Sequence, residues 1–317
     1  MKKNTNISSK TTAINLDDEI ALYIDSLDRK EITKNSYKTI LIQYSKYLKK
    51  HNLVQPTKRD VISYKEYLLK KVGSATVQKT IVVLRGFYKY LCMSNKYDDI
   101  MYGIRGVKIE KTFKRNSLDV DEIFALLKEA KEESNKSIIH YRNYVMISLM
   151  LTTGLRTIEI IRADVSDIMI HKDKCRLYIQ GKGHDDKDEY VKLSPEIYEL
   201  LIEYLKRRND EFEPLFITHK NSSGERLTTR TVRGVVKDLL RAIDIDDKRY
   251  SAHSLRHSLA TILIKEANGT LEEAQQILRH KDISTTEIYN HALTRETNNG
   301  EIKVSNILFR KDGNNNG

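Results

Sequence analysis

The chain has 317 residues, 39% hydrophobic and 31% charged, a composition typical of a soluble protein with room for two domains. No run of about 18 apolar residues is present, and the N-terminus MKKNTNISSKTT lacks the apolar core of a signal peptide, so we expect a cytoplasmic protein without a membrane span. Its two cysteines, Cys92 and Cys175, have no second sulfur ligand nearby; we predict packing roles and neither a disulfide scaffold nor a cysteine zinc site.

Positive charge is concentrated in the first third of the chain. Residues 1–116 carry 24 Lys+Arg against 11 Asp+Glu, a net charge of +13, whereas residues 117–317 carry 31 against 33, a net charge of −2. Such an excess favours a surface that follows phosphates, where counterion release drives binding. A lysine-rich helical domain that is merely well solvated explains the charge equally well.

Apolar residues recur at helical spacing through the basic segment. The pattern predicts helices over 16–27, 33–50, 58–71 and 74–92 and a short fifth segment over 98–104, which together make a small helical bundle. In the fourth helix the apolar stripe consists of Val77, Ile81, Leu84, Phe87 and Leu91. The basic residues Lys79, Arg85 and Lys89 fall mostly elsewhere around the helix and could face a polyanion, although an ordinary amphipathic surface helix has the same pattern.

A domain boundary is predicted at the basic, weakly periodic segment 107–116, VKIEKTFKRN. It separates a helical domain over 15–106 from a second domain over 117–292. Ser117 or Asp119 could cap the first helix of the second domain. Lys111, Lys114 and Arg115 of this linker could follow a phosphate backbone; a solvated tether is the plainer alternative.

The second domain is predicted to be α+β. Helices over 119–132 and 138–153 precede strand-like runs at 165–170, 175–180 and 189–193, and helices then continue to about residue 291. The polar turns between the runs predict a small antiparallel sheet. The tail 293–317 contains one apolar island, EIKVSNILFR, which suits a segment that docks on another subunit.

Four motifs in the second domain carry groups suited to phosphate chemistry. TTGLRTIEIIR places Arg156 at a helix junction, AHSLRHSLAT places His253 and Arg256 on one helical face, and IQGKGHDDKDEY places Lys182 at a hairpin tip. ILRHKDISTTEIYNH supplies His280 and then a helix start, the S-x-x-E box of Ser284 and Glu287, that precedes Tyr289. Arginine suits a phosphodiester because its charged planar fork binds two oxygens at once.

In this order the motifs resemble the tyrosine recombinase, or phage integrase, family, and the resemblance covers nearly the whole chain, with 15–106 similar to its SAM-like core-binding domain. It implies a mainly α protein in which Tyr289 attacks the scissile phosphate to form a 3′-phosphotyrosyl intermediate, without ATP, a metal or another cofactor. Arg156 and Arg256 would grip the nonbridging oxygens, and Lys182 would protonate the leaving 5′ oxygen. His253 would assist proton transfer and His280 would hydrogen-bond the phosphate, while Glu159 would orient the site.

Each of these residues alone has a plainer interpretation. One tyrosine among 18 is far more often a packing or surface residue, and Arg156 with Glu159 could be an ordinary helical ion pair. The ordered set favours the functional interpretation. The hairpin departs from the family pattern, because four carboxylates within 185–189 surround Lys182; we expect them to point away or to help place the loop, which leaves Lys187 as a lesser candidate for the acid.

The resemblance implies a site-specific recombinase that acts as a homotetramer on two double-stranded DNA sites through a Holliday junction. It implies integration and excision or DNA resolution, of a simple Xer-like or mobile-element type, and accessory DNA-bending proteins are compatible with it. Two alternatives are a strand relaxer like type IB topoisomerases and a catalytically silent DNA-binding protein on the same fold.

Overall fold

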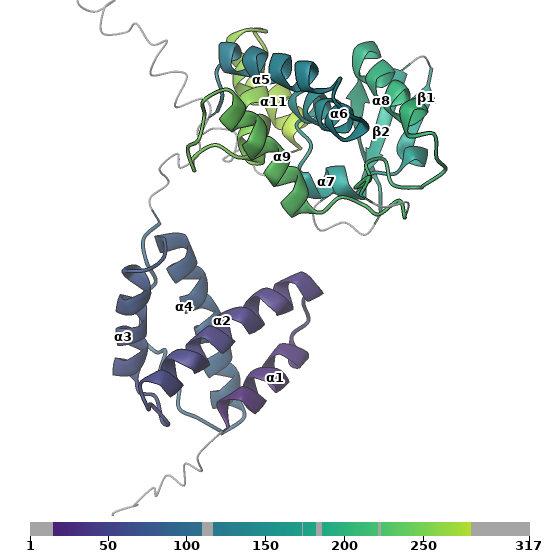
Figure 1. Ribbon diagram of the computed structural model, residues 1–317. Coiled ribbons are helices and arrows are strands. Elements are labelled where there is room, and N and C mark those ends of the chain that lie inside the picture. The colour runs from purple at the N-terminus through teal and green to yellow at the C-terminus, as the bar shows by residue number, and fades with distance from the viewer. Residues whose placement is uncertain (1–14, 110–116, 173, 182–185, 221–222, 280–317) are drawn as a thin grey trace, which may run out of the picture. The chain divides into compact units, whose positions relative to one another are not determined.

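A computed structural model of the chain describes residues 15–109, 117–172, 174–181, 186–220 and 223–279. The chain divides into two compact units, Met1–Thr112 and Phe113–Gly317 (Figure 1). Within the described residues no helix is long and apolar enough to cross a membrane.

The first unit is a helical bundle of α1 (Leu16–Ser26), α2 (Glu31–Lys50), α3 (Lys58–Leu69) and α4 (Ser74–Met93). Helix α4 packs against each of the other three. Its predicted apolar stripe is fully buried, since Val77, Ile81, Leu84, Phe87 and Leu91 are all 0% exposed. The stripe therefore faces the core of the bundle, as its 3.6-residue period predicts.

A network of tyrosines completes this core. The hydroxyls of Tyr44 and Tyr88, both 0% exposed, lie 3.0 Å apart and hydrogen-bond to each other. Burial is the main cause that raises the pKa of both phenols. Each phenol therefore stays neutral and satisfies the other's polar atom inside the bundle.

Two expectations for the first unit are wrong. Residues 98–104 form turns rather than a short helix, because the Asp99 carboxylate accepts the Met101 N–H at 3.1 Å and Gly103 adopts a left-handed φ of 73°. Cys92 is exposed rather than packed, and Cys175 in the second unit is half-buried.

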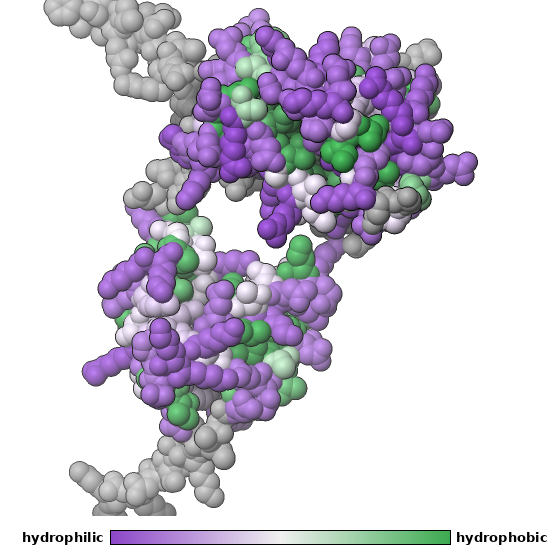
Figure 2. Space-filling model, viewed as in Figure 1, coloured by the Kyte–Doolittle hydropathy of each residue, from purple (hydrophilic) through white to green (hydrophobic). Residues whose placement is uncertain are grey.

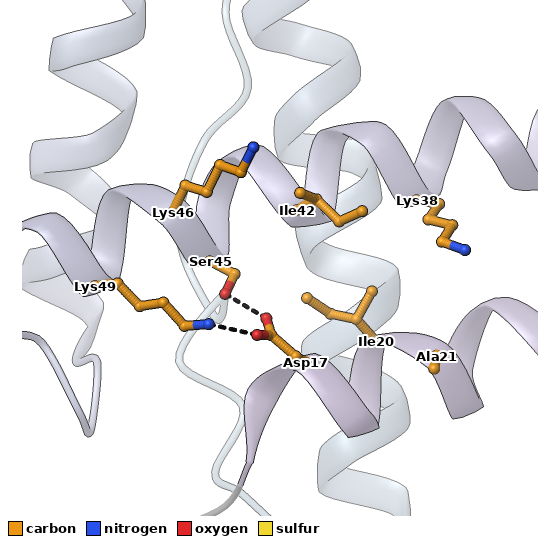
Figure 3. A pocket seen from close by; sticks show the side chains of 8 residues that line it. All are labelled: Asp17, Ile20, Ala21, Lys38, Ile42, Ser45, Lys46 and Lys49. Carbon is orange, nitrogen blue, oxygen red and sulfur yellow. Dashed lines mark hydrogen bonds and ion pairs between the residues drawn. The ribbon is translucent and has the colours of Figure 1, made fainter.

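Helices α1 and α2 are joined at their surface by one carboxylate (Figure 3). The side chain of Asp17 accepts hydrogen bonds from Ser45, at 2.6 Å, and from Lys49. The hydrogen bond from Lys49 is the largest cause that lowers the pKa of Asp17. Beside this contact lies a hollow of about 290 Å³, whose lining is partly lysine, with Lys38 and Lys46 beside the apolar Ile42.

The second unit surrounds a small antiparallel sheet with helices, as predicted. In chain order it contains α5 (Val120–Glu133), α6 (Ile138–Thr153), α7 (Thr157–Arg162), β1 (Ile168–His171), β2 (Lys174–Ile179), β3 (Glu189–Leu193), α8 (Pro195–Arg208), α9 (Thr229–Ala242), α10 (Ala252–Lys265) and α11 (Leu271–Leu278). The strand order is β1-β2-β3, with Ile168 opposite Leu177 and Leu177 opposite Val191. The sequence predicts a strand from residue 165, but Val165–Asp167 form a 3₁₀ turn instead. The Asp167 carboxylate caps this turn by accepting the Asp164 N–H.

Helix α6 is the centre of the second unit. Most of its side chains are buried around its whole circumference, and it packs against α5, α8 and α10. The buried Arg142 of α6 donates to the carbonyl of Ile217 at 2.7 Å, and the buried Arg208 of α8 donates to the carbonyl of Leu215 at 2.9 Å. These arginines hold the segment before α9 in place, which is a structural use of buried cations.

Gly154 ends α6 in a left-handed conformation, with φ 63°, at the point where three helices meet. A Cβ atom built on it would lie 3.0 Å from Leu259 of α10 and 3.2 Å from Leu278 of α11. We expect Gly154→Ala to lower the free energy of unfolding by about 1–3 kcal/mol, through left-handed strain and the displaced neighbours.

The matched control for Gly154→Ala is Gly234→Ala in α9, where nothing lies within 4 Å of the added Cβ. That change should be neutral or stabilise by about 0.5–1 kcal/mol, because alanine is the better helix former. Thermal unfolding of both variants measures the difference, at about 2–4 °C per kcal/mol for a domain of this size. Equal melting temperatures would contradict the strain argument.

Hydrophilic residues cover most of the viewed face of each unit, and hydrophobic residues gather there only in limited patches (Figure 2). Large apolar side chains that are exposed include Ile32, at 80%, and Phe124, at 66%.

Candidate active site

Arg156 lies at the start of a short helix that follows the turn at Gly154. It is the N-cap residue of α7, and its side chain is 25% exposed. Because α6 ends at Gly154 and the buried Leu155 fixes the connection, the guanidinium projects from the junction between two helices, as the sequence indicated.

Glu159, one turn into α7, is the most buried charged group beside this junction. Its side chain is 0% exposed and accepts the Arg156 backbone N–H at 2.8 Å, the Arg156 guanidinium at 2.7 Å and the Arg279 guanidinium at 2.7 Å. Burial alone would raise the pKa of Glu159, but the charge of Arg279 and the bonds from Arg156 outweigh it and hold the pKa below its ordinary value. The arrangement is a buried three-group cluster and not an exposed helical pair.

Arg256 reaches the same junction from α10. It is 2% exposed, and its Nη1 donates to the carbonyl oxygen of Gly154. In the middle of α10, the Ser258 hydroxyl accepts the Leu118 N–H at 2.7 Å and donates within the helix to the Ser254 carbonyl at 2.9 Å, so the helix is tied to the segment before α5. The guanidinium is therefore delivered to the end of α6 by a helix that also bonds to the segment before α5.

His253 lies one turn before Arg256, in the first turn of α10, and is half-buried. Its ring packs edge-on against that of His257, with ring centroids 4.4 Å apart and an interplanar angle of 86°. The i, i+3 spacing places His253 and Arg256 on neighbouring positions of one helical face, as predicted.

Lys187, the lesser candidate for the proton donor, faces the 3₁₀ turn before β1. Its ammonium donates to the carboxylates of Asp164, at 2.6 Å, and of Asp167. Burial lowers the pKa of Lys187, but the hydrogen bonds that its ammonium donates to the two carboxylates outweigh it and the net change is upward. With its pKa raised in this way, Lys187 is a weaker acid than an ordinary lysine.

Several predicted residues lie outside the described residues: Lys182, His280, Tyr289, the Ser284–Glu287 box, Lys111, Lys114 and Arg115. The described chain reaches both sides of Lys182, since β2 and β3 form an antiparallel hairpin whose pairing extends to Ile179 and Glu189. It also ends at Arg279, directly before His280.

The sequence profile described as the phage integrase family matches residues 116–296, and that of its N-terminal SAM-like domain matches residues 20–95. The chain belongs to the phage integrase family. It is therefore a tyrosine recombinase, from a family that catalyses DNA cleavage and rejoining.

Curated relatives of this tyrosine recombinase carry Xer names. The chain is 30% identical over 273 residues to tyrosine recombinase XerD of Oceanobacillus iheyensis, covering 82% of this chain and 87% of the relative. It is 28% identical over 268 residues to tyrosine recombinase XerC of Leptospira interrogans, covering 81% and 82%.

Solved structures share the fold. The XerH site-specific recombinase bound to its difH substrate is 22% identical, covers 84% of this chain and 79% of its own, and has a TM-score of 0.67. A lambda integrase dimer bound to a COC′ core site is 16% identical, covers 85% and 96%, and has the same TM-score of 0.67.

The basic residues predicted on the fourth helix of this recombinase are all exposed. Lys79 donates to the Ser36 hydroxyl at 2.6 Å, and Arg85 donates to the Ile104 carbonyl at 2.9 Å. Arg85 thus also holds the segment that leaves the bundle, together with Gln78, which accepts the Val107 N–H at 2.8 Å.

Sequence reasoning gave Arg279 no role, although the structure brings it into the cluster of Glu159. No local signal could have found this contact, because the two residues are 120 positions apart. Within the described part of the chain no group of three or more His, Cys, Asp or Glu side chains is placed to hold a metal ion.

Proposed function

We propose that this recombinase recombines specific DNA sites through a 3′-phosphotyrosyl intermediate, with Tyr289 as the nucleophile. One observation carries the proposal. Cations from three separate segments meet at the α6–α7 junction, since Arg256 binds the Gly154 carbonyl while Arg156 and Arg279 share Glu159. A converging set of fixed cations is what a reacting phosphodiester requires.

In this proposal Arg156 and Arg256 bind the nonbridging oxygens of the scissile phosphate. Charge accumulates on these oxygens in the transition state, so positive groups fixed beforehand stabilise it more than the ground state. Arg256 is suited to this role because burial and the Gly154 contact hold its guanidinium in place. Arg156 is suited because its side chain remains partly exposed beside Glu159.

Proton transfers complete the reaction. Tyr289 loses its proton as its oxygen bonds to phosphorus, with His253 assisting, and Lys182 gives a proton to the 5′ oxygen that leaves. His280 hydrogen-bonds the phosphate, and Glu159 orients Arg156. The phosphotyrosyl bond conserves the energy of the broken phosphodiester, so rejoining needs no ATP and no other cofactor.

We assign DNA binding to the domain over 15–106, with Lys79, Arg85 and Lys89, and to the linker over 107–116, with Lys111, Lys114 and Arg115. The net charge of +13 on residues 1–116 supports this assignment. The catalytic domain covers 117–292. We further propose a cytoplasmic homotetramer that joins two sites through a Holliday junction, with the tail over 293–317 docking on a neighbouring subunit and DNA-bending proteins assisting.

The test is covalent capture. A duplex carrying the recombination site, found in the DNA flanking the gene and nicked close to the cleavage position, loses a short fragment on cleavage and traps the enzyme on the 3′ end. We expect a denaturation-resistant adduct with the wild-type protein and no metal requirement. Binding to this duplex without any adduct would contradict the proposal.

The proton donor can be identified by separate replacement of the two hairpin lysines. We expect Lys182→Ala to slow cleavage by about 10²–10⁴-fold, because general acid catalysis is lost. Lys187→Ala should change the rate far less, because Lys187 is bound to Asp164 and Asp167. The measurement is the single-turnover rate of adduct formation.

A duplex with sulfur in place of the 5′ bridging oxygen sharpens this comparison. A thiolate leaves without being protonated, so this duplex should restore the rate of Lys182→Ala toward that of the wild type. A rate loss confined to Lys187→Ala, or no restoration of Lys182→Ala by sulfur, would contradict the assignment.

A further inference from the structure

Arg279 occupies a backbone conformation that few residues with a side chain adopt. It ends α11 with φ 50° and ψ 49°, in the left-handed region that favours glycine and asparagine. Its N–H closes the helix on the carbonyls of Gln275 and Gln276. A glycine would perform this backbone function with less strain, so the arginine side chain needs another explanation.

The contacts of the Arg279 side chain account for an arginine at this position. It is 11% exposed, and its Nη2 donates to Glu159 Oε2 at 2.7 Å while its Nη1 donates to the Ile277 carbonyl at 3.0 Å. Its Nε lies 3.7 Å from Glu189 Oε2 at the start of β3. One guanidinium thus connects the end of α11 with α7 and with the hairpin strand β3.

The two oxygens of Glu159 are divided between two arginines. Oε1 accepts the Arg156 guanidinium, whereas Oε2 accepts both the Arg156 backbone N–H and Arg279. Two cations therefore share one buried carboxylate beside the α6–α7 junction, and Arg279 has a second, more exposed carboxylate, Glu189, at 3.7 Å. Without Arg279, Arg156 would be the main cation left to balance the buried charge of Glu159.

We propose that Arg279 is a positioning residue for strand cleavage. It takes up Oε2 of Glu159, so that Arg156 is oriented by this carboxylate without being fully neutralised by it, and it fixes the end of α11 against α7. Arg279 touches no reacting atom in this scheme. The inference rests on the proposed function, because the rate it affects is that of phosphotyrosyl formation.

The decisive variant is Arg279→Gly, which removes the side chain and relieves the left-handed strain at once. We expect a folded protein that binds the site with an affinity within about threefold of wild type, yet cleaves at saturating protein at least about tenfold more slowly. Arg279→Met keeps the aliphatic stem and should show the same loss. Arg279→Lys keeps the charge and should recover part of the rate.

The matched control is Asn209→Gly. Asn209 ends α8 with φ 49° in the same left-handed geometry, and its side chain is exposed. The cleavage rate of this variant should equal that of the wild type, because only backbone strain changes.

A double variant tests whether Arg279 acts through Glu159. If it does, Arg279→Gly combined with Glu159→Gln is no slower than the slower single variant, whereas independent actions would multiply the two losses. A wild-type cleavage rate in Arg279→Gly, or in Arg279→Met if the glycine variant does not fold, overturns the inference. A double variant whose loss of rate is the product of the two single losses also overturns it. Absence of any adduct with the wild-type protein would instead overturn the proposed function itself, and the inference with it.

Discussion

Replacing Tyr289 by phenylalanine will abolish the covalent adduct and leave DNA binding unchanged. The substitution removes one oxygen, which is the atom that bonds to phosphorus in the proposed reaction, and no other group can form the same intermediate. We expect adduct formation to fall by at least about 10³-fold, to below detection. The measurement is a denaturing gel of the nicked duplex after incubation, beside a binding assay on the same preparation.

The control for Tyr289→Phe is Tyr198→Phe in α8, a half-buried tyrosine of the second unit. It loses the same oxygen and should form adduct at the wild-type rate. Residual adduct in Tyr289→Phe would show that another residue supplies the nucleophile, and peptide mapping of that adduct would identify it. Loss of DNA binding by Tyr289→Phe would contradict a purely chemical role.

Replacing Arg156 by alanine is expected to slow cleavage by about 10³-fold, because arginines that stabilise charge in phosphoryl transfer contribute about 10³–10⁵-fold. The backbone N–H of Arg156 still reaches Glu159 in this variant, so α7 keeps its capping contact. Glu159 also keeps Arg279, so its buried charge remains paired. The loss should therefore appear in the single-turnover rate at saturating protein rather than in folding.

Arg162→Ala is the matched control for Arg156→Ala, because Arg162 ends the same short helix. Its cleavage rate should stay close to that of the wild type, and both variants should bind DNA with similar affinity. If Arg156→Ala loses affinity and keeps its saturating rate, Arg156 contributes ground-state binding and not transition-state stabilisation.

Capping residues and apolar periodicity in the sequence predicted most of the helices. The helix predicted over 138–153 has these bounds in the structure, because Ser137 caps its start and Gly154 supplies the left-handed end. Asp119, one of the two cap candidates, forms a capping box with Glu122. The predictions of secondary structure were wrong where an aspartate carboxylate accepts a nearby backbone N–H, at Asp99 and at Asp167. Such a hydrogen bond changes a short periodic run into a turn.

The sequence by itself determined the types of reactive group, their order along the chain and the family they resemble. Only the tertiary structure decided which of them meet. Arg256 and Gly154 are 102 positions apart and Arg279 and Glu159 are 120 apart, so no periodicity or spacing links them. Packing of α10 and α11 around the glycine that ends α6 brings their arginines to one junction, where Arg156 and Arg279 share the buried carboxylate of Glu159.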